Sequence, residues 1–241
     1  LATQLPIFVS CMVKIMNQSL KIGDIPEDWR KSKIIPVFKG GSRTSTKSYR
    51  PISFTSLPCK TLEHIISSAM WNFIESNGIL SENQHGFRKY FSTTTQLLHV
   101  VHHAAQAMNN KLPHHIISFN FAKAFDKVPH DLLMYKLQRY KFSKQILDWI
   151  REWLRNRTSV VTVNGLISSQ FDVTSGVPQG SVLGPLLFLL YVFIRFRLYE
   201  KEKDDSYCSL EHSILVCDCY LFCFMRKKKK IVKKTSNSNF S

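Results

Sequence analysis

The segment from residue 116 to residue 130 constrains the fold more than any other part of the chain. It begins with a short apolar run that includes β-branched residues, passes Asn120 and Asp126, and closes in a Val-Pro turn. This pattern predicts a buried strand that delivers polar residues into a turn. Ligands of α/β proteins gather at such strand ends. We therefore expect Asn120 and Asp126 to lie where the protein would hold a metal ion or a phosphate.

The chain is strongly basic. Its 241 residues contain 33 Lys and Arg against 17 Asp and Glu, which gives a formal net charge of +16. Such a surplus favours a polyanionic partner, either a nucleic acid or an anionic membrane surface. A basic protein without such a partner is the alternative. The most apolar run, residues 182–194, is shorter than the ~20 residues that span a bilayer. It predicts a core helix, and we expect no membrane partner and no obligate protein partner.

The cysteines and the first apolar segment bear on the cellular compartment. A zinc site from Cys208, His212, Cys217 and Cys223 is an alternative that no Cys-x-x-Cys spacing supports. Residues 5–16 are apolar but lack the basic leader and the small-residue cleavage site of a signal peptide. We expect an intracellular protein, nuclear or cytoplasmic, with reduced cysteines.

Hydrophobic periodicity predicts a mixture of helices and strands. Apolar residues recur at helical spacing in residues 1–20, 62–74, 93–108, 131–140, 144–155 and from 182 onward. Residues 33–38 predict a strand, which Pro36 would make an edge or bulged strand. Asn164-Gly165 predicts a hairpin turn between residues 159–163 and 166–173.

Three loops carry residue types that suit a phosphate-containing ligand. Residues 39–50 combine two glycines with Lys39, Arg43, Lys47 and Arg50. Their cationic groups can bind phosphates through charge-assisted hydrogen bonds, although a solvated basic loop has the same composition. Residues 83–89 form a second loop with glycine and arginine, and residues 175–181 form a loop of small residues.

Six ordered segments resemble the reverse transcriptases of non-LTR (LINE-like) retrotransposons. They are residues 25–30 (Ile-Pro-Glu-Asp-Trp-Arg), 37–39 (Val-Phe-Lys), 49–53 (Tyr-Arg-Pro-Ile-Ser), 84–88 (Gln-His-Gly-Phe-Arg), 125–130 (Phe-Asp-Lys-Val-Pro-His) and 176–185 (Gly-Val-Pro-Gln-Gly-Ser-Val-Leu-Gly-Pro). The resemblance covers about residues 1–192. The order of the segments is more specific than any one of them.

The resemblance implies an α+β fold of the right-hand polymerase type. Residues 1–112 would form the fingers and residues 113–192 a partial palm, with the thumb absent. Residues 193–241 form a divergent basic tail, which we expect to be disordered. The family joins a primer 3′-hydroxyl to the α-phosphate of a deoxynucleotide on an RNA or DNA template, with two Mg²⁺ ions. The implied partners are an RNA template, a DNA primer and deoxynucleotides.

The resemblance also assigns nucleotide-binding roles to particular residues. Lys39 and Arg50 would contact the incoming triphosphate, where positive charge stabilises developing negative charge. The Phe125 ring would crowd the 2′ carbon of the sugar and select deoxyribose over ribose; without the motif, Phe125 would be a core aromatic. Gln179 and Gly180 would line the nucleotide pocket. Residues of the 84–88 segment would lie near the template-primer: Gln84, Gly86 and Arg88.

The sequence departs from the family pattern at the expected metal site. The family reads Leu-Asp-Phe-Ser-Lys-Ala-Phe-Asp where this chain has residues 119–126, so Asn120 replaces the metal-binding Asp. Asparagine keeps one carbonyl oxygen but loses the charge that a divalent cation prefers. The family takes further carboxylates from a Tyr/Phe-Ala-Asp-Asp hairpin. Here Asp218 is the candidate survivor, and the charged Asp204-Asp205 pair is less suited to a buried hairpin.

The predicted function is therefore that of a reverse transcriptase domain from a LINE-like element, as a partial and catalytically impaired copy. A non-catalytic nucleic-acid-binding remnant is the alternative, and a product without function is a third reading. Composition and motif order do not separate the last two.

Overall fold

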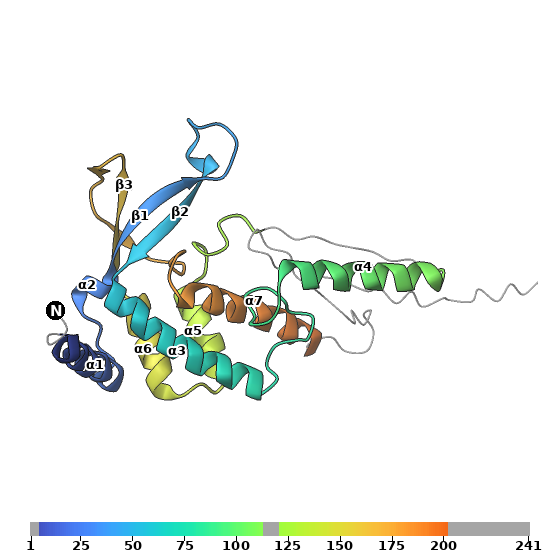
Figure 1. Ribbon diagram of the computed structural model, residues 1–241, viewed down its shortest axis with the longest axis horizontal. Helices are drawn as coiled ribbons and strands as arrows, with labels where there is room; N and C mark the ends of the chain where they lie inside the picture. The colour runs from blue at the N-terminus through green and yellow to red at the C-terminus, as the bar shows by residue number, and fades with distance from the viewer. Residues whose placement is uncertain (1–4, 113–120, 202–241) are drawn as a thin grey trace, which may run out of the picture. The chain divides into compact units, whose positions relative to one another are not determined.

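The computed structural model describes residues 5–112 and 121–201 (Figure 1). The chain divides into two compact units. Among the described residues, the first unit holds residues 5–81 and 122–196, and the second holds residues 82–112, 121 and 197–201. Helices and strands are both present, as an α+β fold requires.

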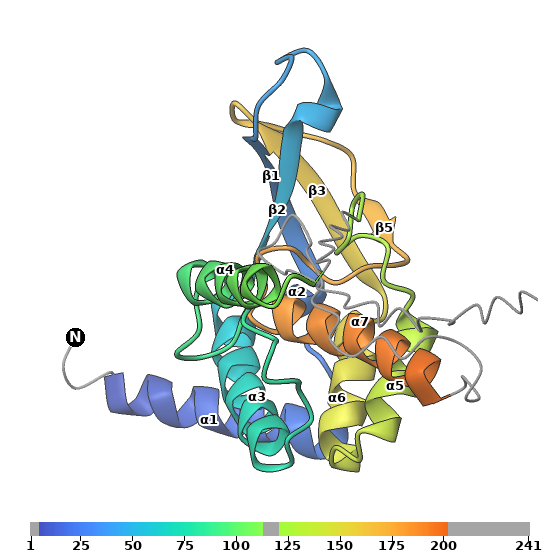
Figure 2. The same ribbon diagram turned by 90° about the vertical axis from the view of Figure 1, so that its right-hand side faces the viewer.

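The first unit contains the sheet (Figure 2). Its strands are β1 (Lys31–Phe38), β2 (Tyr49–Thr55), β3 (Arg157–Val163), β4 (Leu166–Ile167) and β5 (Phe171–Val173). The order is β2-β1-β3-β4, and β5 also pairs with β3. β1 runs antiparallel to β2 and parallel to β3. The sheet therefore joins strands that lie more than a hundred residues apart in the sequence.

The environment of Pro36 corrects one prediction. β1 is an inner strand, because β2 and β3 flank it, and the expectation of an edge strand is wrong for the strand as a whole. The ladder with β3 covers residues 31–34 and ends before Pro36, which lies opposite Pro51 of β2. A proline has no N–H to donate, so it is tolerated in the half of the strand that has one partner. The predicted basic loop 39–50 is also shorter than expected, because Arg50 belongs to β2.

The helices follow the predicted periodicity. Those of the first unit are α1 (Leu5–Ile22), α2 (Glu27–Arg30), α3 (Leu57–Ser76), α5 (His130–Arg139) and α6 (Lys144–Leu154), together with α7 (Leu183–Lys201), whose last residues belong to the second unit. A short 3₁₀ turn, η1 (Thr46–Ser48), precedes β2. Fully buried residues form the core: Leu62, Met70, Leu133, Leu137, Trp149, Ile150, Trp153, Leu183 and Leu187. The expected core helix from residue 182 is thus confirmed, and no helix among the described residues is long and apolar enough to cross a membrane.

The hairpin turn forms where the sequence predicts it. Asn164 and Gly165 both have positive φ, +48° and +82°, as the two central residues of a type I′ turn require. Val163 pairs with Leu166 across the turn. The predicted second strand is split, because β4 ends at Ile167 and β5 begins at Phe171.

The second unit contains α4 (Thr93–Asn109). Its N-terminus is closed by a reciprocal cap: the Ser92 hydroxyl accepts the Thr95 N–H, and the Thr95 hydroxyl accepts the Ser92 N–H. Such a cap satisfies backbone donors that the first helical turn leaves without partners. It also fixes where the preceding loop, residues 82–92, enters the helix.

Candidate functional site

The loop of residues 175–181 depends on two glycines that pack against other backbone segments. Gly176 has φ of +89°, and a Cβ there would lie 2.7 Å from the Asp126 Cα. Gly180 has φ of +113°, and a Cβ there would lie 2.6 Å from the Ser53 carbonyl oxygen. Residues other than glycine rarely adopt such φ values, and neither position has room for a Cβ atom. The loop therefore approaches the 122–128 turn and β2 more closely than it could if positions 176 and 180 carried any residue other than glycine.

Backbone hydrogen bonds hold the loop in this place. Its first residues bond to the 122–128 turn: Gly176 N–H donates to the Val128 carbonyl and Val177 N–H to the Phe125 carbonyl, each at 2.9 Å. Further along, the Ser53 N–H of β2 donates to the Gln179 carbonyl at 2.6 Å. The loop thus joins two segments from distant parts of the sequence.

These contacts bring three of the predicted nucleotide-binding segments together. Arg50 lies on β2 three residues before Ser53, Gln179 and Gly180 lie on the loop, and Phe125 lies on the turn beneath Val177. Arg50 is exposed and Gln179 is half-buried. The sequence could suggest this grouping only through the resemblance, since no local pattern links residues 50, 125 and 179.

Lys39 follows the last residue of β1, at the start of the basic loop that joins β1 to β2 in a hairpin. The Lys39 backbone N–H donates to the Ser48 carbonyl at 2.9 Å. The neighbouring Phe38 and Tyr49 rings pack edge to face, with their centroids 5.5 Å apart. The Arg43 guanidinium lies over the Phe38 ring at 5.1 Å. Lys39 and Arg50 therefore share one hairpin, and aromatic contacts order part of the loop between them.

The Phe125 side chain packs into the core of the first unit. It is 7% exposed, and its ring stacks on Phe188 of α7 with centroids 4.9 Å apart. This is the core-aromatic environment that its residue type favours. Its role at the sugar stays a prediction. The next residue, Asp126, has a raised pKa because burial disfavours its charge, and Lys123 partly opposes this.

The predicted metal ligands, Asn120 and Asp218, lie outside the described residues. Within residues 5–112 and 121–201, no group of three or more His, Cys, Asp or Glu side chains could hold a metal ion. The magnesium site therefore stays a prediction.

The predicted template-primer residues form a folded loop in the second unit. The Gln84 side chain is buried, and its Nε2 donates to the Gly86 carbonyl at 3.0 Å. The Arg88 guanidinium lies over the Phe91 ring at 4.8 Å. Gln84 thus shapes the loop through Gly86, and its predicted contact with the template-primer remains untested.

Histidines gather beside this loop. His85 shares a hydrogen bond with the Thr95 hydroxyl at 2.8 Å and stacks on His99 at 5.7 Å. His99 in turn faces His103, with their Nε2 atoms 2.9 Å apart. Burial lowers the pKa of His85, and the nearby charges of His99 and Arg88 lower it further.

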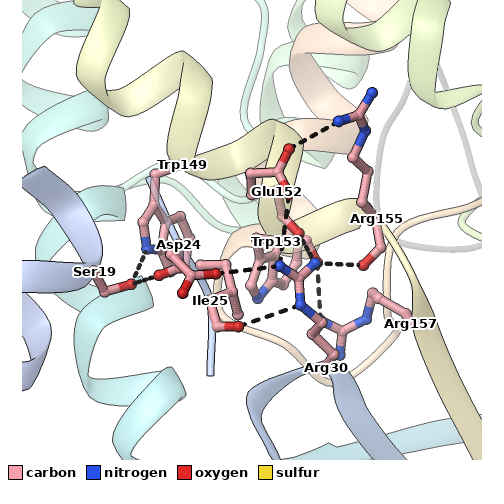
Figure 3. Close-up of polar contacts among 9 residues, drawn as sticks. All are labelled: Ser19, Asp24, Ile25, Arg30, Trp149, Glu152, Trp153, Arg155 and Arg157. Atoms are coloured by element: carbon pink, nitrogen blue, oxygen red, sulfur yellow. Dashed lines mark hydrogen bonds and ion pairs between the residues drawn. The ribbon is translucent and has the colours of Figure 1, made fainter. Parts of the chain in front are cut away.

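Arg30, the last residue of the 25–30 motif, is held by hydrogen bonds to backbone carbonyls (Figure 3). One guanidinium nitrogen, Nη1, donates to the carbonyl oxygens of Glu152 at 2.7 Å and Arg155 at 2.9 Å, at the end of α6. Its Nε donates to the Ile25 carbonyl at 3.3 Å. The last carbonyls of a helix lack partners within it, so Arg30 ties the 25–30 turn to the C-terminus of α6.

Sequence reasoning missed Glu63. This fully buried residue of α3 accepts the backbone N–H groups of Val182, at 2.7 Å, and Leu183, at 3.3 Å, where α7 begins. The available signal was an acidic residue between Leu62 and Ile66 in an apolar helical pattern. Acidic residues are rarely fully buried without a partner.

Comparison with known proteins decides the family. A family model described as reverse transcriptase (RNA-dependent DNA polymerase) matches residues 37–234. The chain belongs to this family. The reverse transcriptase match extends past residue 192, where the resemblance of the motifs was expected to end.

The relatives that match are encoded by mobile elements. The chain is 35% identical over 178 residues to the RNA-directed DNA polymerase from mobile element jockey of Drosophila melanogaster, covering 73% of this chain and 19% of that protein. It is 33% identical over 178 residues to the probable RNA-directed DNA polymerase from transposon BS of the same fly, covering 73% and 20%. A retrovirus-related Pol polyprotein from type-1 retrotransposable element R2 of Popillia japonica is 24% identical over 190 residues, covering 78% and 25%.

These relatives confirm the resemblance stated from the motifs. The chain is a reverse transcriptase domain of the non-LTR, LINE-like kind. It spans about a fifth of the length of the jockey and BS proteins.

Proposed function

We propose that this chain binds a primer-template and a deoxynucleotide, as the part of a reverse transcriptase that adds a deoxynucleotide to a primer 3′-hydroxyl. The observation that carries the proposal is the hydrogen bond between Ser53 and Gln179. It places the 179–180 segment beside the strand of Arg50, so two motifs that are distant in the sequence, one suited to a triphosphate and one to a nucleotide, lie next to each other. The net charge of +16 suits a nucleic-acid partner.

Lys39 and Arg50 are the cations that we assign to the triphosphate. They lie on one hairpin, whose strands are joined from Ser32–Thr55 to Phe38–Tyr49. Arg50 offers a planar group that can bond two phosphate oxygens at once, whereas Lys39 offers a compact charge. Together they would neutralise the charge that develops on the leaving pyrophosphate.

We assign residues 1–112 to fingers and residues 113–192 to a partial palm, followed by the divergent tail 193–241. The order of the motifs supports this assignment. The compact units cut across it, because residues 5–81 share the first unit with residues 122–196. Segments that we assign to the fingers and to the palm thus belong to one compact unit.

We also propose that this copy is catalytically impaired. When bound, Mg²⁺ ions would supply the positive charge that activates the primer hydroxyl and stabilises the leaving group. Asn120 stands at the position that the family pattern assigns to a metal-binding Asp, and Asp218 is the candidate survivor of the Asp-Asp hairpin. An amide at position 120 lacks the charge of a carboxylate, so metal affinity falls.

Primer extension on an RNA template with Mg²⁺ and deoxynucleotides tests the proposal, with primer-template binding measured on the same samples. We expect salt-dependent binding by the unmodified chain and extension only after Asn120→Asp. Asn164→Asp, at an exposed hairpin turn that either residue can form, adds the same charge elsewhere and should restore nothing.

Three outcomes would change the proposal. Extension by the unmodified chain would contradict the impairment. Binding without extension in both proteins would favour a non-catalytic nucleic-acid-binding remnant. Binding that is weak and insensitive to salt would contradict both readings, because contacts to phosphates release counterions.

A further inference from the structure

We propose that Glu63 is a positioning residue: its carboxylate fixes the nucleotide-binding loop, residues 176–181, by holding the first turn of α7. The proposal deepens the function proposed above, since it rests on Gln179 and Gly180 lining the nucleotide site. It concerns a residue on α3 that lies outside all six motifs.

The carboxylate bonds the backbone where the loop becomes a helix. Glu63 Oε2 accepts the N–H of Val182 at 2.7 Å and the N–H of Leu183 at 3.3 Å. The next donor, the Gly184 N–H, goes to the Ser181 hydroxyl at 3.0 Å, and that hydroxyl donates to the Pro178 carbonyl at 2.8 Å. Helix N-termini leave such donors without internal partners and carry partial positive charge. Glu63 and Ser181 together complete the cap.

The carboxylate is held firmly on its other side. Glu63 is 0% exposed, and its Oε1 accepts the Cys59 thiol at 3.5 Å. The buried Arg157 of β3 is an electrostatic partner of this carboxylate: burial lowers the pKa of Arg157, while the charge of Glu63 opposes that shift. Arg157 is anchored by a hydrogen bond from Nη1 to the Trp153 carbonyl at 3.1 Å. A buried charge with this support has little freedom to move.

The second half of the loop is therefore held by a single segment of the chain, whereas its first residues, Gly176 and Val177, bond to the 122–128 turn. Ser53, which holds Gln179, lies on β2, and Glu63 lies on α3, which begins two residues after β2 ends. Arg50 belongs to the same β2 strand. One β2–α3 segment thus carries the predicted phosphate ligand, Arg50, and the groups that hold Gln179 and Val182. A change at Glu63 would alter the position of the loop relative to Arg50.

Two measurements on the full chain test this role. Hydrogen–deuterium exchange, followed by mass spectrometry of peptides that cover residues 176–190, reports on the Val182 and Leu183 amides. Equilibrium titration with a deoxynucleotide in the presence of primer-template reports on the site. For Glu63→Gln, which keeps the shape but loses the charge, we expect about tenfold faster exchange at these amides and about tenfold weaker nucleotide binding.

Met70→Ala is the matched control. Met70 lies on the same helix and is fully buried in the core, and its thioether carries no charge that could bond the amides of α7. It lowers stability by making a cavity, so it shows what destabilisation alone does to the loop. The affinity for primer-template, measured in parallel, should be the same in Glu63→Gln as in the unmodified chain.

The outcomes separate this inference from the proposed function. If exchange at Val182 and Leu183 in Glu63→Gln rises no more than in Met70→Ala, the positioning role is wrong. If exchange rises but nucleotide affinity falls no further than in the control, the carboxylate caps the helix without serving the site, and the inference is again wrong. If the unmodified chain binds no deoxynucleotide, the proposed function fails, and the inference fails with it whatever the exchange shows.

Discussion

The Ser53 N–H donates to the Gln179 carbonyl at 2.6 Å, across 126 residues of sequence. This bond joins β2 to the loop that precedes α7, and it lies beside Gly180, whose missing side chain makes the approach possible. The geometry of the predicted nucleotide site therefore depends on backbone groups as much as on side chains. Substitutions that disturb this approach should be costly.

Gly180→Ala should destabilise the protein and displace the loop. The new Cβ would lie 2.6 Å from the Ser53 carbonyl oxygen, and the φ of +113° is strained for alanine. Strain at such a φ costs about 1–3 kcal/mol, and forcing an extra methyl group into a packed contact costs about 1–3 kcal/mol more. Urea denaturation of the two proteins measures the difference in the free energy of unfolding.

Gly40→Ala is the control for this substitution. Gly40 has nearly the same φ, +116°, but nothing lies within 4 Å of the position of its Cβ. Gly40→Ala should lower the free energy of unfolding only by the cost of the strained φ, about 1–3 kcal/mol. Equal losses at the two positions would show that the approach of Gly180 to Ser53 contributes nothing to stability.

Arg30→Ala should lower the free energy of unfolding by about 2–3 kcal/mol, because hydrogen bonds to charged groups contribute about 1.5–3 kcal/mol. The guanidinium is 14% exposed and links the Ile25 carbonyl to the carbonyls of Glu152 and Arg155. Arg151→Ala removes an arginine from the same region, where its exposed pair with Asp148 spans 2.9 Å. Such surface pairs contribute about 0–1 kcal/mol. Similar effects in the two variants would argue against the anchoring role of Arg30.

Cys59 should resist alkylation in the native protein, whereas Cys11 should react readily. Burial raises the pKa of the Cys59 thiol to about 12, with Glu63 adding to the shift, and the thiolate is the reactive form. Cys11 is exposed. Brief labelling with iodoacetamide at pH 8, then peptide mapping by mass spectrometry, compares the two. Labelling of Cys59 at the rate of Cys11 before urea is added would contradict this buried environment.

His85 should make stability depend on pH. Burial, with the charges of His99 and Arg88, lowers the folded-state pKa below the ordinary 6.5, so the unfolded chain binds the proton more readily. The stabilisation is present above pH 6.5 and is lost as the pH falls toward the folded pKa. NMR titration of the histidine rings should give His85 a pKa below 6.5. Between pH 7 and pH 5, the free energy of unfolding should fall less in His85→Gln than in the unmodified chain. An equal fall in the two proteins would show that other groups cause the pH dependence.

Local patterns predicted several elements, but they missed β2 and did not separate β4 from β5. The Asn164-Gly165 turn and the helices from residues 57 to 109 needed only turn chemistry and hydrophobic periodicity, which act within a few residues. The ordered motifs identified the family, which the comparisons confirmed. The edge-strand prediction from Pro36 was wrong, because a proline shows only that one N–H donor is absent. It does not indicate which strands flank the rest of β1.

The site was less accessible to sequence reasoning. Glu63 resembles any charged residue on an amphipathic helix until α7 is placed against it. Phe125 carries a motif-based role at the sugar, but its ring stacks on Phe188, a partner 63 residues away. An acidic residue in the apolar pattern around Leu62 and Ile66 marks Glu63 as unusual, but no nearby residue identifies the partner of Glu63 or of Phe125, so neither contact could be predicted from spacing.

By itself, the sequence determined the basic charge, most of the helices, the Asn164-Gly165 turn and the family. These properties follow from composition and from interactions between neighbours in the chain. Only the tertiary structure decided that Ser53 meets Gln179, that Glu63 caps α7 and that Arg30 closes α6. The physical reason is that buried backbone donors and acceptors must find partners once the chain is compact, and the nearest partner in space is set by packing.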